Sequence, residues 1–162
     1  MSGFQIYSLT VRDGQLALCP LPGRDGNYEA DLRAIAAWAP DLVITLTTAE
    51  EMAQLGASAL GRDVENIGAK WVHFPIADFG TPEDDAQSTW EDVRALGLRQ
   101  LSGGGRVLVH CRGGCGRSGM VVLRLMIDSG EAPAEALARL RKTRACAVET
   151  QGQMDWAMGH QG

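Results

Sequence analysis

The sequence predicts an α/β fold, with a central, mostly parallel sheet flanked by helices. Short runs of branched apolar residues alternate with segments whose apolar residues recur at helical spacing, which is typical of strand–helix–strand units. The chain has 162 residues, and 45% of them are hydrophobic, which is enough for one core. No repeat, low-complexity tract or linker divides the sequence. We therefore expect a single domain over residues 1–162.

The N-terminal half is predicted to begin with a β-hairpin. Residues 4–11 and 15–19 are expected to be strands around the turn formers at 12–14, and the Pro- and Gly-containing segment 20–23 ends the second strand. Residues 28–38 have the apolar spacing of a helix. Three further elements are expected: a strand over 42–46, a short helix opened by a capping-box pattern at 48–51, and a strand over 71–76.

The C-terminal half is predicted to be mainly helical around one buried strand. Residues 106–110 form this central strand, and a helix over 84–101 precedes it. The glycine run 103–105 ends that helix. Further helices are expected over 117–129, over 133–143 and from 151 onward. Strands alternate with helices in both halves, and this alternation predicts a mostly parallel sheet.

The composition argues against several classes of function. A net charge of −5 speaks against a general surface for nucleic acid or for an anionic membrane. No apolar run approaches the ~20 residues of a membrane span, and no signal-peptide pattern is present at the N-terminus. The four cysteines, at positions 19, 111, 115 and 146, show neither zinc-ligand spacing nor a disulfide framework. We therefore expect a protein of the reducing cytoplasm.

The segment 110–119, His-Cys-Arg-Gly-Gly-Cys-Gly-Arg-Ser-Gly, is predicted to carry the chemistry. It joins a predicted strand to a predicted helix by a tight loop. Such a loop points backbone N–H groups inward, and the helix dipole adds positive potential, so the loop can hold an anion of phosphate size. The same field favours the thiolate form of Cys111. Arg117 can bind two phosphate oxygens with its planar guanidinium, and a thiolate beneath that phosphate can accept a phosphoryl group.

This motif resembles the signature of the cysteine-based protein tyrosine and dual-specificity phosphatases. In that signature His-Cys is followed by five residues, then Arg, then Ser or Thr, and each of these positions matches. The alternative is a buried cysteine in a glycine-rich turn beside a surface arginine, because free cysteine usually packs as a small core residue. The resemblance implies that the phosphoryl group is bound by Arg112, Gly113, Gly114, Cys115, Gly116 and Arg117.

Asp78 is the candidate for the general acid that a phosphomonoester needs at its leaving oxygen. The signature loop has no acid, whereas the segment 73–82 leaves a predicted strand and holds Asp78 between turn formers, which suits a mobile loop. The apolar neighbour Phe79 would partly desolvate the carboxyl and favour its protonated form. A surface turn is the alternative interpretation. The competing acids resemble first-turn helix carboxylates, and they are Glu83, Asp84 and Asp85.

Three segments together resemble the cyclin-dependent-kinase-associated phosphatase group of dual-specificity phosphatases. They are residues 16–23, residues 75–82 and the signature, and their order and spacing match over most of the chain. The resemblance implies a compact domain with a central sheet flanked by helices. It implies Cys111 as the nucleophile, Arg117 as the phosphate binder and Asp78 as the general acid. It also implies that no metal and no cofactor takes part.

Two neighbours of the nucleophile are expected to support it. In such loops the hydroxyl of Ser118 can donate to the thiolate and ease its departure from the phosphocysteine. A helix N-cap is the alternative role for Ser118, and the two roles are compatible. His110 is expected to hydrogen-bond the loop backbone and so to support the ionised thiol.

A positioned water must then hydrolyse the phosphocysteine. Residues 149–153, Glu-Thr-Gln-Gly-Gln, resemble the tract with which some family members supply a glutamine for this water. Gln153 fits the spacing best and Gln151 is second. Because polar residues at a helix start need no catalytic reason, helix capping is an equal alternative.

Cys115 raises the question of oxidation, because it lies in the same loop as the nucleophile. A nearby thiol could trap a sulfenic acid formed on Cys111. Direct bridging within the loop is limited by the Cα separation that a disulfide needs. Cys19 and Cys146 compete for the trapping role, and we interpret Cys115 as a filler of the loop.

Together these observations predict a phosphomonoester hydrolase that acts on phosphotyrosine, phosphoserine or phosphothreonine in proteins through a phosphocysteine. The expected partner is a phosphorylated protein or peptide, with no nucleic acid and no membrane, and the chain is expected to be a monomer. One alternative substrate is a phosphoinositide or nucleotide, which the extra charge of Arg112 would favour, although a broad basic face is lacking. A second alternative is a pseudophosphatase that binds phosphorylated residues without hydrolysis.

Overall fold

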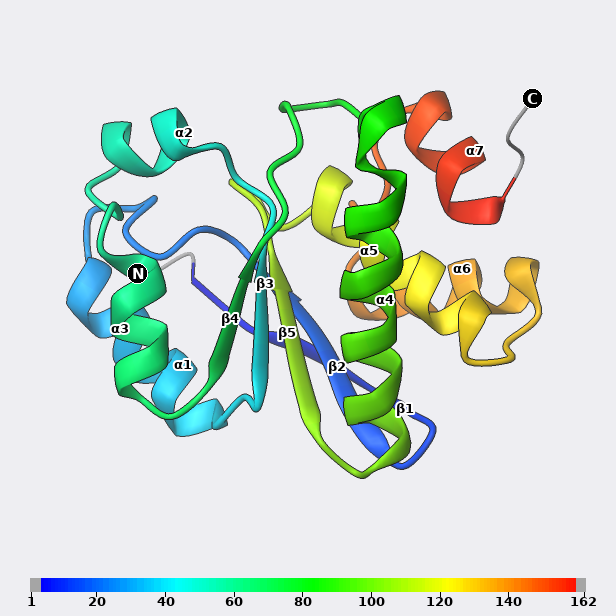
Figure 1. Cartoon of the computed structure of the whole chain (residues 1–162), viewed down its shortest axis with the longest axis horizontal. Helices are drawn as coiled ribbons and strands as arrows, with labels where there is room; N and C mark the ends of the chain where they lie inside the picture. Colours follow the sequence, from blue (N-terminus) through cyan, green and yellow to red (C-terminus); the bar gives the residue numbers. More distant parts are fainter. Residues whose placement is uncertain (1–3, 160–162) are drawn as a thin grey trace.

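A five-stranded mixed sheet forms the centre of the molecule, and helices cover both of its faces (Figure 1). The computed structural model describes residues 4–159, so the ends of the predicted 1–162 domain lie outside the described residues. The strand order is β1-β2-β5-β3-β4; only the β1–β2 hairpin is antiparallel, and the other pairs are parallel. This confirms the predicted α/β class. The strands are β1 (Tyr7–Val11), β2 (Gly14–Cys19), β3 (Leu42–Thr45), β4 (Lys70–His73) and β5 (Arg106–His110).

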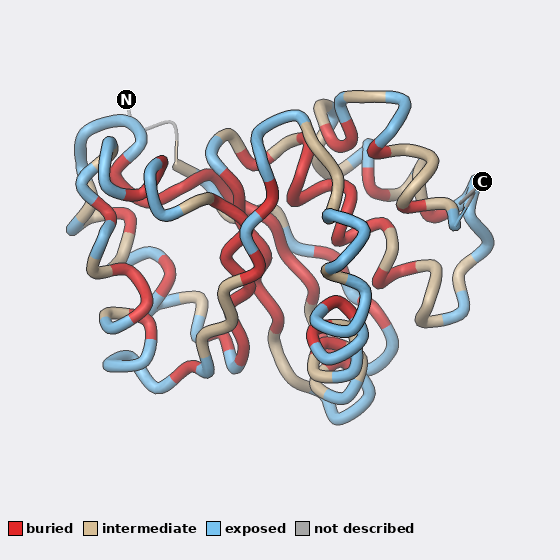
Figure 2. The backbone as a smooth tube through the Cα atoms, turned by 45° about the horizontal axis from the view of Figure 1, so that its top comes forward, coloured by how far each residue is buried: buried red, intermediate tan, exposed pale blue. Residues whose placement is uncertain are grey.

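The helices form two layers. One layer holds α1 (Tyr28–Trp38), α2 (Ala49–Gln54) and α3 (Leu60–Asn66), and the other holds α4 (Gln87–Ser102), α5 (Gly116–Asp128), α6 (Pro133–Thr143) and α7 (Gln151–Met158). Strand β5 contributes side chains to the core on each face of the sheet, because Val107 and Val109 pack in one apolar cluster and Leu108 packs in the other. Burial on both faces explains the continuous apolar runs of the central strands. Figure 2 shows the buried residues concentrated in the middle of the molecule, and strands β2, β3 and β5 and helix α5 are buried along most of their length.

Two predicted strands are shorter in the structure, and one helix was not predicted. The expected strand 4–11 begins only at Tyr7. The expected strand 71–76 ends at His73, and the chain beyond it makes only scattered bonds, such as that from the Phe74 N–H to the Thr45 carbonyl at 2.9 Å. Pro75 interrupts the ladder because it has no N–H to donate. Helix α3 was not predicted. It is short and has no side-chain cap, so only its buried Leu60 and Val64, four residues apart, could have indicated it.

The parallel strands bring four loops together at one edge of the sheet. The segments that follow β2, β3, β4 and β5 all leave the carboxyl ends of their strands there, at the top of the view in Figure 1. This edge is where open α/β sheets generally bind ligands. Within residues 4–159, no helix combines the length and the apolar character needed to cross a bilayer.

Candidate active site

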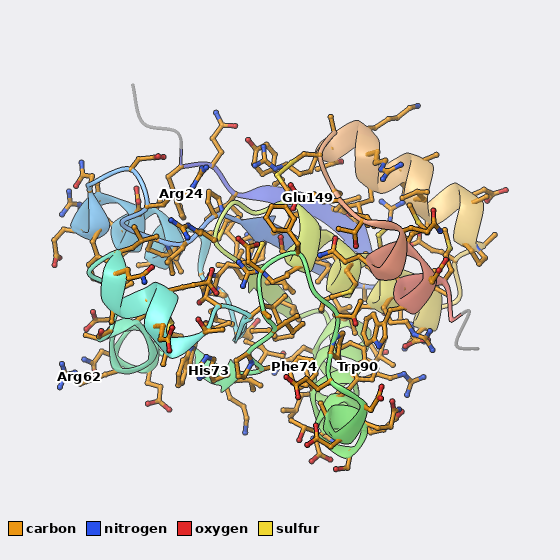
Figure 3. All side chains as sticks on the ribbon, turned by 90° about the horizontal axis from the view of Figure 1, so that it is seen from above. Arg24, Arg62, His73, Phe74, Trp90 and Glu149 are labelled. Carbon is orange, nitrogen blue, oxygen red and sulfur yellow. A yellow bond between two sulfur atoms is a disulfide. The ribbon has the colours of Figure 1, made fainter. Side chains whose placement is uncertain are left out.

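A cleft at this edge contains the predicted nucleophile. Its lining comes from several distant segments of the chain: Arg24, Asp78, Phe79, Cys111, Arg112, Gly113, Cys115, Gly116, Arg117, Arg144 and Glu149. Figure 3 looks onto this edge, with Arg24 on the side of α1 and Glu149 on the side of α7. The fold therefore brings together the three residues with the main predicted roles, Cys111, Arg117 and Asp78.

Cys111 lies at the floor of the cleft, where its side chain is buried. Its Sγ atom is 3.2 Å from Oγ of Ser118 and accepts the Ser118 N–H at 3.4 Å. As a thiolate, Cys111 would accept hydrogen bonds from both groups. Helix α5 begins at Gly116 with Cys115 as its N-cap, so Ser118 lies inside the first turn. The alternative interpretation of Ser118 as the N-cap is therefore wrong, and its hydroxyl faces the sulfur instead.

The signature loop rests on the segment that follows β2. The Leu21 N–H donates to the Arg112 carbonyl at 3.1 Å. Gly114 has a φ of 72°, and a Cβ on it would lie 2.7 Å from the carbonyl carbon of Cys19. Glycine is required there by both the backbone conformation and the close approach.

Arg117 is fixed by a carboxylate that the sequence did not reveal. Its Nη1 and Nη2 donate to the two carboxylate oxygens of Glu51 at 2.7 and 2.8 Å, and Nη1 also donates to the Ile76 carbonyl at 2.8 Å. Nη2 lies 3.2 Å from Oδ1 of Asp78. The terminal edge of the guanidinium is thus used by Glu51. On the side edge, Nη2 also faces Asp78, whereas Nε has no protein partner within residues 4–159.

Glu51 and Arg117 stabilise each other's charged forms. Burial alone would raise the pKa of Glu51, but hydrogen bonds from Arg117 and from Thr48 lower it to about 2. Burial likewise opposes the charge on Arg117, yet the contact with Glu51 and the nearby Cys111 raise the pKa of Arg117 above its ordinary value. The predicted capping box at Thr48 is confirmed, since Thr48 and Glu51 cap each other. The same carboxylate thus caps α2 and holds Arg117.

Asp78 reaches the cleft on the segment after β4, as predicted, but its surroundings differ from the expectation. The Asp78 side chain is 44% exposed, and Phe79 is 61% exposed with a φ of 62°. Phe79 turns toward solvent, so the expected desolvation of Asp78 by Phe79 is wrong. The competing acids lie elsewhere: Glu83 and Asp84 line a separate pocket with Trp90, and Asp85 lines neither pocket.

His110 is buried beneath the loop and stays neutral. Burial lowers its pKa to about 4. The Thr45 hydroxyl accepts the Trp71 indole N–H at 2.8 Å and lies 2.7 Å from Nε2 of His110. If Thr45 donates to Nε2, the proton of His110 resides on Nδ1, which lies 3.4 Å from the Cys111 carbonyl. The predicted hydrogen bond from His110 to the loop backbone is therefore present, although long.

Gln153 does not line the cleft. It is buried, and its Oε1 accepts the N–H groups of Glu149 and Thr150 at 2.9 and 3.2 Å, while its Nε2 donates to the Gly80 carbonyl at 3.2 Å. Gln153 and Thr150 form a capping box, so the capping alternative holds for this residue. Gln151 is exposed and bonds Asp155 at 2.8 Å. In this tract Glu149 is the residue that lines the cleft.

Comparison with known proteins agrees with this geometry. A family model described as "Swiss Army Knife protein, DSP-PTPase phosphatase domain" matches residues 21–157. The chain belongs to the dual-specificity protein tyrosine phosphatases. It is 30% identical over 148 residues to cyclin-dependent kinase inhibitor 3 of Mus musculus, covering 87% of this chain and 69% of that protein. The corresponding protein of Rattus norvegicus is 31% identical over 149 residues, with the same coverage.

Solved structures show the same fold. Kinase associated phosphatase with its catalytic-site cysteine substituted by serine superimposes with a TM-score of 0.86 at 24% identity, covering 99% of this chain and 95% of that one. Tk-PTP in its active form gives a TM-score of 0.73 at 30% identity, covering 95% of each chain. This chain is thus a cysteine-based phosphatase of the dual-specificity and tyrosine phosphatase type, and the predicted resemblance is confirmed.

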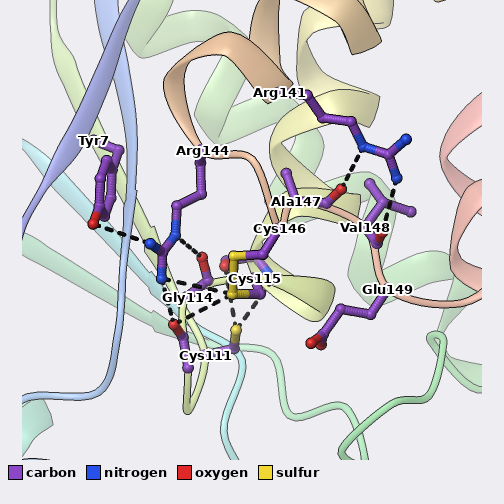
Figure 4. The surroundings of a disulfide bond; sticks show 12 residues. Tyr7, Cys111, Gly114, Cys115, Arg141, Arg144, Cys146, Ala147, Val148 and Glu149 are labelled. Carbon is purple, nitrogen blue, oxygen red and sulfur yellow. Dashed lines mark hydrogen bonds between the residues drawn. A yellow bond between two sulfur atoms is a disulfide. The ribbon is translucent and has the colours of Figure 1, made fainter.

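The structure contradicts the prediction that the cysteines form no disulfide. Cys115 and Cys146 form a disulfide (Figure 4), so the expected lack of disulfides and the interpretation of Cys115 as a filler are both wrong. The pairing was hidden because the segment after α6 folds back onto the loop, where the Val148 N–H donates to the Cys115 carbonyl at 3.2 Å. Cys19 is free and buried. Burial is the main cause that raises the pKa of the Cys19 thiol, and the nearby Cys111 raises it further.

Proposed function

We propose that this phosphatase hydrolyses phosphate monoesters on tyrosine, serine or threonine residues of proteins, through a phosphocysteine intermediate. One observation carries the proposal: Sγ of Cys111 lies at the floor of a cleft that Arg117 and Asp78 also line. Nucleophile, anion binder and acid are thereby in reach of one phosphoryl group.

In the first step the Cys111 thiolate attacks phosphorus. The S–P bond forms as the bond from phosphorus to the ester oxygen breaks, and protonated Asp78 gives its proton to that oxygen. Arg117 binds two of the phosphoryl oxygens with its Nε–Nη2 edge, while Glu51 holds the terminal Nη1–Nη2 edge in place. Asp78 leaves Nη2 of Arg117 as the phosphate arrives.

In the second step water attacks the phosphocysteine. Asp78, now a carboxylate, takes a proton from this water, the S–P bond breaks, and inorganic phosphate forms. The Ser118 hydroxyl, 3.2 Å from the sulfur, stabilises the departing thiolate. We assign Gln153 an indirect part, since it holds the backbone N–H of Glu149 and the Gly80 carbonyl rather than facing the cleft.

A phosphorylated protein or peptide fits the charge of the rim. Arg24 and Arg112 line the cleft and are exposed, and within residues 4–159 neither guanidinium takes part in a hydrogen bond or an ion pair. They are available to acidic groups next to the phosphorylated residue. A net charge of −5 disfavours an anionic membrane or nucleic acid. The names of the similar proteins refer to kinases, which supports a phosphoprotein partner. Monomeric state and cytoplasmic location stay predictions.

The proposal is tested by acid-quenching the enzyme during turnover of a phosphotyrosine or phosphothreonine peptide carrying ³²P. We expect label on the protein, located at Cys111, and burst release of the dephosphorylated peptide. Cys111→Ser should bind the peptide but release no phosphate, because a serine hydroxyl is a much weaker nucleophile than a thiolate. Turnover by Cys111→Ser close to that of the wild type would contradict the nucleophile. Peptide binding without turnover by the wild type would indicate a pseudophosphatase.

A further inference from the structure

Arg144 binds the signature loop although it lies outside the signature. It follows α6, and its Nε donates to the Gly114 carbonyl at 3.0 Å while its Nη2 donates to the Gly113 carbonyl at 3.0 Å. Nη2 also lies 3.6 Å from Sγ of Cys115. A planar guanidinium can hold two neighbouring carbonyls at a fixed angle, which the single ammonium group of lysine cannot do.

Tyr7 fixes the same guanidinium from β1. Nη1 of Arg144 donates to the Tyr7 hydroxyl at 3.0 Å, and the guanidinium carbon lies 4.3 Å from the centre of the Tyr7 ring. All three guanidinium nitrogens of Arg144 therefore have partners within the protein, and two of these nitrogens bind carbonyls of the signature loop. This distinguishes Arg144 from Arg24 and Arg112, whose guanidinium groups have no protein partner within the described residues 4–159.

These contacts determine how the loop presents its N–H groups. In a trans peptide the carbonyl and the following N–H point in opposite directions. Because the carbonyls of Gly113 and Gly114 face Arg144, the N–H groups of Gly114 and Cys115 point away from it. Figure 4 shows Arg144 on one side of the loop and Cys111 on the other. The N–H groups are thereby turned toward the side on which the nucleophile lies.

We propose that Arg144 is a positioning residue, which aims the N–H groups of Gly114 and Cys115 at the phosphoryl group on Cys111. This inference rests on the proposed function, because it gives Arg144 a part in shaping the phosphate site. N–H donors held in place before reaction stabilise the charge of the transition state without reorganisation. Loss of Arg144 should therefore affect kcat more than KM.

The test compares Arg144→Lys and Arg144→Met with the wild type on an aryl phosphate, with inorganic phosphate as the binding probe. Both variants should lose roughly 10- to 100-fold in kcat/KM, mainly in kcat, which is the scale of loss when residues that orient the ligands of a metal are replaced. Phosphate should also bind more weakly. The matched control is Arg141→Met, because Arg141 also binds two carbonyls, of Ala147 and Val148, but none in the loop. It should keep kcat near the wild-type value.

Three results would overturn the inference: wild-type kcat in Arg144→Lys, an equal loss in Arg141→Met, or a loss restricted to phosphopeptides, which would make Arg144 a substrate contact.

Guanidinium ion at millimolar concentration should partly restore kcat in Arg144→Ala. No restoration in a variant whose near-UV circular dichroism matches the wild type would also count against the inference. If the wild type hydrolyses no phosphate ester, the proposed function fails. The phosphate affinities of wild type and Arg144→Met then decide the inference on their own.

Discussion

Asp78 is the residue whose role can be tested most sharply, because the structure separates it from its competitors. Asp78→Asn should lower kcat by roughly 10²–10⁴ for esters with poor leaving groups, since no group then protonates the leaving oxygen. The loss should shrink for aryl phosphates whose leaving group needs no proton. The measurement is kcat against leaving-group basicity, together with the pH–rate profile, whose basic limb should flatten in the variant.

The matched controls for Asp78 are Glu83→Gln and Asp84→Asn, whose side chains line the neighbouring pocket with Trp90. Both should keep the leaving-group dependence of the wild type. Loss of the basic limb in either control, together with its survival in Asp78→Asn, would transfer the role of general acid to that residue.

The sequence predicted the residues of the site that are close together along the chain, and of those that arrive from a distance it predicted Asp78 but missed the partners of Arg117 and of the loop. Cys111, Arg117 and Ser118 belong to one motif, so spacing alone identified them. Glu51 meets Arg117 across 66 positions, and Arg144 meets Gly114 across 30. Such contacts depend on how the sheet orders its strands, which no local pattern expresses.

At the scale of elements, local patterns predicted most strands and helices correctly. The ends of strands and the short helices were predicted less well. Helix α5 has a continuous apolar sequence and was predicted to within one residue at each end. Helix α3 has seven residues and no cap, so its stability comes from packing rather than from a pattern in its own sequence. Irregular pairing after Thr45 and His73 shortened the strand predicted over 71–76.

The disulfide joins two elements, and its contribution can be measured by unfolding. Cys115 and Cys146 are 31 residues apart, and closing a loop of that length stabilises a fold by roughly 3–4 kcal/mol through the entropy of the unfolded chain. Cys146→Ser should therefore lower the free energy of unfolding in urea by up to about this amount without reductant. The wild type in reductant should show a similar loss.

A double variant provides the control for this pair. If Cys115 and Cys146 are bonded, Cys115→Ser combined with Cys146→Ser should lose no more stability than either single variant. Losses that simply add, or that are unchanged by reductant in the wild type, would show that the two thiols act separately in solution.

At the scale of the whole molecule, the charged and neutral groups under the cleft link stability to pH. His110 has its pKa lowered to about 4 by burial, whereas an unfolded histidine takes up its proton near pH 6.5. The unfolded chain thus binds this proton first as the pH falls, and stability is lost between pH 6.5 and 4. Glu51, with a pKa of about 2 in the folded chain, adds a further loss that begins below pH 4.5.

These two windows make the origin of acid sensitivity testable. The free energy of unfolding in urea should fall by about 2 kcal/mol between pH 7 and pH 5, a range in which His110 titrates in the unfolded chain and Glu51 stays mostly ionised in both states. His110→Asn will be less stable at pH 7, because it disturbs the contact with Thr45, but its stability should change less over this range. A variant that keeps the full wild-type slope would show that His110 is not the group responsible. A slope that appears only below pH 4.5 would instead indicate that Glu51 and its ion pair with Arg117 dominate the response of the fold to acid.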